Sequence, residues 1–373
     1  MMPQEELVWG IWPQPVPGCT PLTPWRPTRC GSLKTMAMRS KSQPRLAKVR
    51  WNMGPCQHET WAAALQKLEV EPEFCTLRQW RGFQIGSNRF HVRMNLDFCH
   101  DKHELAKALL QEPTAAAYLP ETYLSISDFV QSGQSDLEDG RWFLKISDVD
   151  YGCGILCFET PLTSVQLEGK LAELQQEALR RLTELRKAKG CKPREIGGHI
   201  VIQKAVETRL EKAQTRGFKE DLRVYVCCSI SVPHRVFVYR RMGLRRAPAA
   251  LAAAALGKHL DNAAQCTHYG HITPVSSAED WPAYPLMFPQ ICRAVGSIMK
   301  VVTPVLEERC TVLLGMDFIC DEQRPYLLEI NQVPRLCYED PQVQAWTEGM
   351  AIDFLRLVVL HETLGSRSAW LPV

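Results

Sequence analysis

The sequence predicts an α+β protein whose sheets are mostly antiparallel. Strand-like and helix-like runs mix along the whole chain, without an internal repeat or a long low-complexity tract. Two pairs of strand-like runs follow each other closely, residues 219–226 before 235–240 and residues 314–321 before 325–331. Runs placed in this way pair as antiparallel hairpins. Residues 167–189 instead carry apolar side chains at every third or fourth position, which is typical of an amphipathic helix.

Further elements follow from the same periodicities. In residues 101–110, Asp101 is in an N-cap position and Glu104 lies at the spacing of a capping box. The other helices are expected at residues 59–68, 289–306 and 343–361. The other strands are expected at residues 142–146, 155–158 and 199–207.

Composition places the chain among ordinary globular proteins. It has 373 residues, of which 45% are hydrophobic and 23% are charged, and its formal net charge is +3. This length suffices for two or three lobes with sizeable cores. The small net charge does not favour a nucleic-acid partner, and no apolar run reaches the length of a membrane span.

The fifteen cysteines are scattered, with no C-x-x-C pair. This pattern favours reduced thiols in a cytosolic compartment, and we expect a cytoplasmic protein. Cys99, His100 and His103 come closest to a transition-metal cluster, but no second ligand pair follows at a suitable spacing. A structural metal is therefore not predicted there.

The first 50 residues differ from the rest of the chain. They are rich in Pro and basic residues, and no acidic residue occurs between Glu6 and Glu59. An organelle transit peptide is similarly poor in acidic residues, but the Pro content opposes an amphipathic helix. We interpret residues 1–50 as a disordered basic extension. An N-terminal lobe is expected at 51–140, a central lobe at 141–205 and a C-terminal lobe at 206–362.

The hairpin at residues 314–331 carries the main candidate metal site. Glu329 and Asn331 are two positions apart and share one face of a strand, which leaves Leu328 and Ile330 for the core face. Asp317 on the paired strand lies across from them. Two carboxylates and an amide oxygen form a hard-oxygen site suited to Mg²⁺. The alternative is an amphipathic hairpin with a hydrated outer face.

Cationic side chains in other strands indicate an anionic ligand. Lys145 lies in the apolar strand 142–146, and Lys is almost never buried without a partner. The following Gly-Cys-Gly turn at 152–154 allows backbone N–H groups to approach phosphates, although most such turns only join strands. Arg223, Arg240 and Arg245 are candidates for an anion-binding cluster, with surface arginines on a sheet as the alternative.

Several motifs in this order resemble the tubulin–tyrosine ligase-like family of the ATP-grasp superfamily, over roughly residues 90 to 360. The matching segments are Leu119–Tyr123, Lys145, Gln203–Lys204, Lys219 with Asp221–Arg223, Tyr239–Arg240, Leu244–Arg245, His259–Leu260 with Asn262, Met316–Phe318 and Leu328–Asn331. The resemblance implies an ATP-grasp fold, with ATP held in a cleft between the central and C-terminal lobes.

The resemblance also implies roles for individual residues. Lys145 would contact the α- and β-phosphates, and Gln203 with the backbone of Lys204 and Val206 would hold the adenine. Asp317, Glu329 and Asn331 would bind Mg²⁺. The reaction centre would be lined by Lys219, Asp221, Arg223, Arg240 and Asn262.

The implied activity is ATP-dependent ligation. A carboxylate would be activated as an acyl phosphate and then joined to an amine, with the acidic C-terminal tail of tubulin and a free amino acid as the presumed partners. The implied location is cytoplasmic, with association to the cytoskeleton or a cilium. The basic residues Arg240, Arg241, Arg245 and Arg246 are candidates for recruiting the acidic tail.

The chain departs from the family pattern in ways that keep two other functions open. Asp261 stands where the family has Thr or Ser, and Arg241 and Met242 replace an acidic residue and Gly. One alternative is a binding module that keeps the fold but has lost turnover. The other is an ATP-grasp ligase that acts on a small carboxylate unrelated to tubulin.

Overall fold

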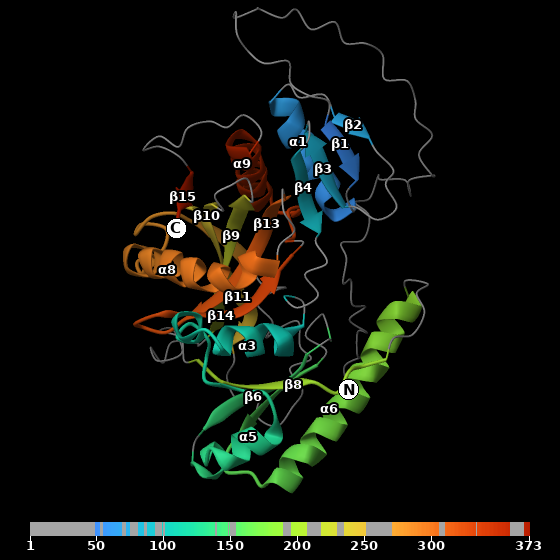
Figure 1. The fold of residues 1–373 in the computed structure, drawn as a ribbon, viewed down its shortest axis with the longest axis vertical. Helices are drawn as coiled ribbons and strands as arrows, with labels where there is room; N and C mark the ends of the chain where they lie inside the picture. The colour runs from blue at the N-terminus through green and yellow to red at the C-terminus, as the bar shows by residue number, and fades with distance from the viewer. Residues whose placement is uncertain are drawn as a thin grey trace, which may run out of the picture. The chain divides into compact units, whose positions relative to one another are not determined.

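Two β-sheets organise the chain in the computed structural model (Figure 1). Residues Leu46–Val373 make up one unit of the fold. The predicted basic extension lies almost wholly outside the described residues. The structure describes residues 49–52, 55–68, 72–74, 81–85, 88–93, 99, 101–138, 140–147, 149, 154–188, 195–206, 218–229, 235–250, 271–305, 310–332, 334–358 and 369–373.

The larger sheet is built around β13. This strand pairs antiparallel with β9 and β14, and its start pairs in parallel with β4. The strands of the larger sheet are β1 (Val49–Asn52), β2 (Pro72–Phe74), β3 (Arg81–Ile85), β4 (Asn88–Arg93), β9 (Phe218–Ser229), β10 (Arg235–Tyr239), β11 (Met242–Ala250), β12 (His271–Val275), β13 (Cys310–Cys320), β14 (Pro325–Asn331) and β15 (Trp370–Pro372). The sheet thus joins residues 49–93 to strands of the predicted C-terminal lobe, and the lobe boundaries stay a prediction.

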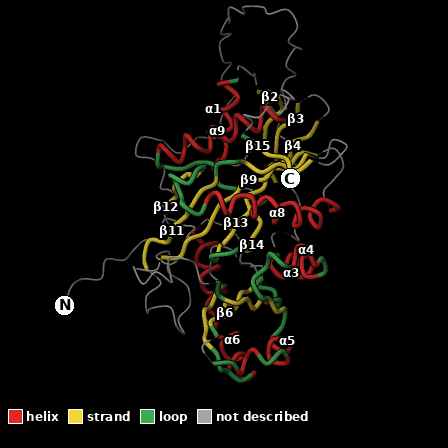
Figure 2. The backbone as a smooth tube through the Cα atoms, turned by 90° about the vertical axis from the view of Figure 1, so that its left-hand side faces the viewer, coloured by secondary structure: helices red, strands yellow, loops and turns green. Residues whose placement is uncertain are grey.

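The smaller sheet has the order β5-β8-β6-β7 and antiparallel pairing throughout. Its strands are β5 (Thr122–Tyr123), β6 (Arg141–Ile146), β7 (Ile155–Glu159) and β8 (Ile200–Lys204). The helices α5 (Ile126–Gln131) and α6 (Ser164–Ala188) cover one face of it, with Phe129 and Leu174 packed against Leu144 and Ile202 (Figure 2).

Strand alternation assigns the two faces of the larger sheet to different helices. On β9, Val224 and Val226 pack in one core with α8 (Tyr284–Val302). Tyr225 and Cys227 pack in another core with α1 (Pro55–Lys67) and α9 (Pro341–Val358). Because successive strand residues point to opposite faces, a fully apolar run on β9 serves two cores at once.

The remaining short helices connect these layers. They are α3 (Lys102–Leu110), α4 (Pro113–Ala116) and two 3₁₀ turns, η1 (Gln134–Asp136) and η3 (Thr303–Val305). The predicted N-cap of α3 is confirmed, since the Asp101 side chain accepts hydrogen bonds from the backbone N–H groups of His103 and Glu104.

The expected α+β class with antiparallel hairpins is confirmed, and four helix starts are corrected. The helices expected from residues 59, 167, 289 and 343 begin at Pro55, Ser164, Tyr284 and Pro341.

Proline is tolerated at the start of a helix, as at Pro341, because the first N–H groups have no partner within the helix. Pro289 instead lies inside its helix, where it cannot donate to the carbonyl group four residues earlier.

We expect the substitution Gly243→Ala to destabilise the fold. An added Cβ at Gly243 on β11 would lie 2.6 Å from Cη2 of Trp346 on α9, which is too close for carbon atoms in contact. Overpacking of this kind costs about 1–3 kcal/mol. Chemical denaturation would measure this loss.

Gly169→Ala is the matched control. Gly169 lies inside α6, and an added Cβ there would have no other heavy atom within 4 Å. Since Ala favours a helix over Gly by roughly 0.8–1 kcal/mol, this variant should be more stable than the wild type. Equal stability of the Gly243→Ala variant and the wild type would contradict the packing of α9 on β11.

Candidate functional site

The candidate site is centred on the carboxylate of Asp317, which is 1% exposed on β13. Strand register places Asp317 directly between Arg223 on β9 and Glu329 on β14. The sequence prediction that Asp317 lies across from Glu329 is therefore confirmed.

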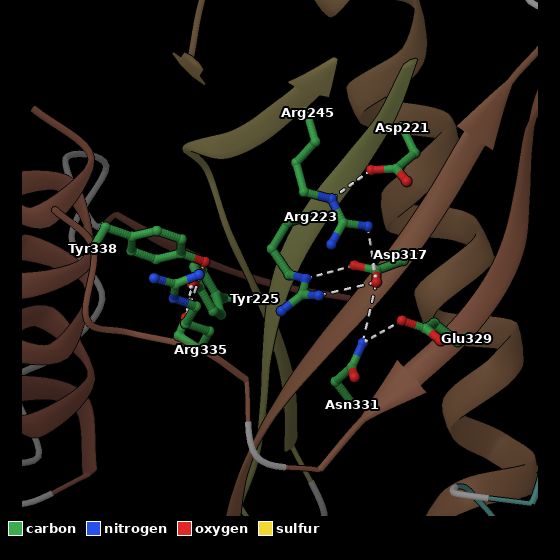
Figure 3. Close-up of polar contacts among 9 residues, drawn as sticks. All are labelled: Asp221, Arg223, Tyr225, Arg245, Asp317, Glu329, Asn331, Arg335 and Tyr338. Carbon is green, nitrogen blue, oxygen red and sulfur yellow. Dashed lines mark hydrogen bonds and ion pairs between the residues drawn. The ribbon is translucent and has the colours of Figure 1, made fainter. Parts of the chain in front are cut away.

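Two buried arginines bind this carboxylate (Figure 3). Arg223 donates from Nε to Oδ1 over 2.5 Å and from Nη2 to Oδ2 over 2.9 Å. Arg245 on β11 lies 2.9 Å from Oδ2 through Nη2, and its Nε donates to Asp221 over 2.5 Å. Burial alone lowers the pKa of Arg223, but the charge of Asp317 reverses this and raises it above the ordinary value. Both guanidinium groups are therefore charged.

Asn331 connects Asp317 to Glu329. Its Nδ2 donates to Oδ2 of Asp317 over 3.1 Å and to Oε1 of Glu329 over 3.0 Å (Figure 3). The expected core position of Leu328 is corrected, because a bulge shifts the register from Asp317–Glu329 to Phe318–Leu327 and leaves Leu328 as the extra residue. Leu327 takes the buried position instead.

Acidic and basic groups are matched in number at the site. Burial raises the pKa of the Glu329 carboxyl, but a hydrogen bond with Asp317, the charge of Lys102 and a hydrogen bond from Asn331 outweigh burial and lower the pKa to about 2. The carboxyl groups of Asp221, Asp317 and Glu329 are matched by the cationic groups of Arg223, Arg245 and Lys102.

The donor set fits Mg²⁺ after one local change. Asp317, Glu329 and Asn331 supply the hard oxygen atoms that Mg²⁺ takes. As placed, Asn331 turns its NH₂ group toward both carboxylates, and half a turn of the amide brings its oxygen there. Of the four donor contacts to the Asp317 carboxylate, one reaches Oδ1 and three reach Oδ2, so an ion at Oδ2 would replace the Asn331 contact.

Gly315 provides room for Arg223. A Cβ at Gly315 would lie 2.8 Å from Pro334 Cβ and 3.2 Å from both Cδ and Nη1 of Arg223. In the sequence, this close contact is indicated only by a glycine within a strand, two positions before Asp317. Glycine inside a strand often marks a place where another group approaches the backbone closely.

Three further residues at the site were not singled out from the sequence. The hydroxyl groups of Tyr225 and Tyr338 donate to the carbonyl oxygen of Arg335 over 3.0 and 3.2 Å (Figure 3). The Arg335 guanidinium lies 4.9 Å from the centre of the Tyr338 ring. These contacts tie the segment after β14 to β9. They depend on tertiary packing, so no local pattern marks them.

The phosphate and adenine candidates lie together on the smaller sheet. Lys145 donates from Nζ to Oε1 of Gln203 over 2.5 Å, and Gln203 donates to Thr122 over 3.1 Å. The Lys204 backbone N–H donates to the carbonyl of Glu121 over 2.9 Å. Val206 follows the end of β8 and is half-buried. The contact with Gln203 uses one of the three N–H donors of the Lys145 ammonium group.

The remaining candidates do not join Arg223. Arg240 is exposed, and its backbone carbonyl accepts a hydrogen bond of 2.7 Å from the hydroxyl group of Tyr284 on α8. Alternation after Val238, which packs in the α8 core, places Arg240 on the α8 side of the sheet. The expected cluster of three arginines is therefore corrected to Arg223 and Arg245.

Other expectations concern residues that lie outside the described part of the chain or in the core. Lys219 lies on β9, and Asn262 lies outside the described residues, as do Asp261, Gly152 and Cys153. Gly154 is buried, and a Cβ there would lie 3.1 Å from both Ile146 and Val149, so it serves close packing.

The prediction that Arg245 recruits an acidic tail is wrong. Arg245 is 4% exposed and is bound to Asp221 and Asp317. Arg246, the next residue on β11, points to the opposite face and pairs with Glu220 at 2.5 Å. A single register between β9 and β11 therefore directs one arginine into the site and the other to the surface.

Replacing Asp317 with Asn should strongly destabilise the fold. The change removes the charge that two buried guanidinium groups share, and breaking a buried ion pair costs about 3–5 kcal/mol. Urea denaturation of Asp317→Asn beside Glu322→Gln would measure the difference. Glu322 is exposed in the turn between β13 and β14, so its variant should stay within about 0.5 kcal/mol of the wild type. A loss below about 1 kcal/mol in Asp317→Asn would show that Asp317 does not hold these strands together.

Within the described part of the chain, no helix is long and apolar enough to cross a membrane.

The fold is similar to that of a known ATP-grasp enzyme domain. No protein-family model matches the sequence, and no curated protein matches it. Among solved structures, the chain is similar to the C-terminal domain of K. lactis Pby1, an ATP-grasp enzyme that interacts with the mRNA decapping enzyme Dcp2. The sequence identity is 16% and the TM-score is 0.51, over 87% of this chain and 97% of that chain. The expected ATP-grasp fold is thus confirmed.

Proposed function

We propose that the chain is an ATP-dependent carboxylate–amine ligase. The observation that carries this proposal is the group of Asp317, Glu329 and Asn331, held beside two buried arginines on an ATP-grasp fold. A hairpin with a merely hydrated outer face does not require a buried carboxylate that is fixed by residues from three other strands.

The proposed reaction has two steps. An oxygen of the acceptor carboxylate attacks the γ-phosphorus of ATP, ADP leaves, and an acyl phosphate forms. The amine of the second substrate then attacks the acyl carbon, phosphate leaves, and an amide remains. Mg²⁺ held by Asp317, Glu329 and Asn331 would neutralise phosphate charge.

The chain's own cations act on charge that develops in these steps. Arg223 is positioned by both oxygens of Asp317, so its guanidinium is ordered before substrate arrives. Arg245 fixes Asp317 from the other side and acts as a positioning residue. Preorganised donors stabilise a transition state more than mobile donors do, because they need no reorganisation. Lys145 would supply a cation to the α- and β-phosphates from the smaller sheet.

The motifs that resemble tubulin–tyrosine ligase-like enzymes favour a protein tail as the acceptor and a free amino acid as the amine. An acidic tail of tubulin is the acceptor that we propose. Of the basic residues expected to recruit it, Arg240 and Arg241 are exposed. Arg246 is half-exposed but already pairs with Glu220.

One observation favours a second candidate, a nucleotide-binding module without turnover. Oδ2 of Asp317 is already in contact with Arg223, Arg245 and Asn331, and Lys145 donates to Gln203. If these contacts do not exchange when a nucleotide binds, the metal and the phosphates are not held for reaction. The two candidates differ in turnover and agree in ATP binding.

The experiment that separates them measures amino-acid incorporation. The full chain is incubated with ATP, Mg²⁺, tubulin and labelled tyrosine, glutamate or glycine. We expect incorporation by the wild type and by Glu322→Gln. We also expect at least a roughly 100-fold loss in Glu329→Gln, since a metal ion contributes several kcal/mol to transition-state stabilisation.

The other outcomes are equally informative. ATP binding without incorporation of any amino acid would support the non-catalytic module. ATP consumption with small carboxylates but not with tubulin would support a small-molecule ligase. Unchanged incorporation in Glu329→Gln would contradict the proposed metal ligand.

A further inference from the structure

A second cluster of metal-ligating side chains lies at the start of α3, apart from the carboxylates of β13 and β14. It consists of His103, Glu104 and His199. The first two residues follow the N-cap Asp101, whose Oδ1 accepts hydrogen bonds from both of their backbone N–H groups, over 2.9 and 3.1 Å. The cap therefore fixes the backbone that carries two of the three side chains.

The ring of His103 is oriented as in a metal ligand. Its Nδ1 lies 3.0 Å from the carbonyl oxygen of Ile200 on β8. A carbonyl oxygen only accepts, so Nδ1 carries the proton of this hydrogen bond. In metal sites, the second ring nitrogen of a ligating histidine commonly donates to a backbone carbonyl in this way. The other nitrogen, Nε2, faces Oε1 of Glu104 at 4.0 Å.

His199 completes the group from the residue before β8. Its ring stacks on that of His103, with the centres 4.7 Å apart and the planes 29° apart. Its backbone carbonyl accepts the N–H of Ser147 over 3.0 Å, which fixes this residue against β6. The ligand atoms of the three side chains all lie within 4.8 Å of one another.

We propose that His103, Glu104 and His199 bind a divalent transition-metal ion of the Zn²⁺ class. Two imidazoles and one carboxylate are a donor set that such ions accept, whereas Mg²⁺ prefers oxygen ligands alone. Tetrahedral bonds of roughly 2.0–2.2 Å would bring the ligand atoms to about 3.4 Å from one another, so the 4.0 Å between His103 and Glu104 would shorten. The exposed ring of His199 would turn out of its stack on His103 to direct a nitrogen at the ion, and water would fill the remaining positions.

The sequence did not predict a metal at Cys99, His100 and His103, and the proposed cluster shares only His103 with that group. Cys99 is 3% exposed, and burial raises the pKa of its thiol to about 12. Cys99 therefore packs as a core residue. His100 lies outside the described residues. Glu104 also has Lys107 at 3.9 Å, a cation that the metal would displace.

An ion at this position would link the two sheets to each other through α3. It would hold His103 and Glu104 on α3 to His199 at the start of β8. The neighbouring Lys102 reaches the carbonyl of Val149 over 3.3 Å, and its charge acts on Glu329. The ion would therefore set the position of the helix that places a cation beside Glu329.

The test is Co²⁺ binding by the full chain without an affinity tag, followed by visible absorption and competed with Zn²⁺. We expect one Co²⁺ per chain at this site, and His199→Ala and Glu104→Gln should each weaken its binding at least about tenfold. His271→Ala is the matched control, because His271 is an exposed histidine on β12. It should bind Co²⁺ like the wild type, as should Glu322→Gln, since Glu322 is exposed in the turn between β13 and β14.

Two results would overturn the proposal. One is the absence of Co²⁺ binding by the wild type. The other is Co²⁺ binding that both His199→Ala and Glu104→Gln leave unchanged, since the ion would then occupy another site. Thermal denaturation of each variant without metal shows that a loss of binding is not a loss of fold, because His199 and Glu104 are at the surface.

Discussion

The rest of the site depends on the contacts of the Asp317 carboxylate. Its two oxygens hold Arg223 from β9, Arg245 from β11 and Asn331 from β14, so one side chain connects four adjacent strands. A buried carboxylate is stable only when its charge is compensated and its acceptor positions are filled. Here two arginines compensate the charge, and four donor contacts reach the two oxygens. Two flanking residues support these contacts. Gly315 leaves space for the Arg223 side chain, and the carboxylate of Asp221 compensates the positive charge of Arg245.

The contacts that stabilise Asp317 in the sheet also compete with metal binding. A carboxylate oxygen that is held by several protein donors stabilises the sheet, but to bind a metal ion it must release at least one of these donors. Asn331 is the natural partner to release, because it is neutral and half-buried, whereas the arginines are buried and charged. On the smaller sheet, the ammonium group of Lys145 likewise has a protein partner, since it donates to Gln203. In the proposed ligase, Mg²⁺ and ATP supply the replacement contacts.

The sequence predicted those parts of the site that depend on strand alternation and nearby pairing. Asp221 with Arg223, and Asp317 opposite Glu329, were found in this way. The burial of Arg245 was not predicted. It depends on the register between β9 and β11, which pair in the sheet although β10 lies between them along the chain. The displaced Leu328 results from a bulge without a glycine or proline to mark it. Lys102 was missed because a lysine in the first turn of a helix is usually exposed to solvent.

The role of Asp317 and Glu329 is tested most directly by crystals grown with Mn²⁺ and a non-hydrolysable ATP analogue. Mn²⁺ replaces Mg²⁺ among oxygen ligands and gives an anomalous signal. We expect an anomalous peak within coordination distance of one oxygen from each carboxylate, with the Asn331 amide turned and the Arg223 pair intact. A bound nucleotide whose metal lies elsewhere, while Asn331 still bridges the two carboxylates, would contradict the proposed metal site.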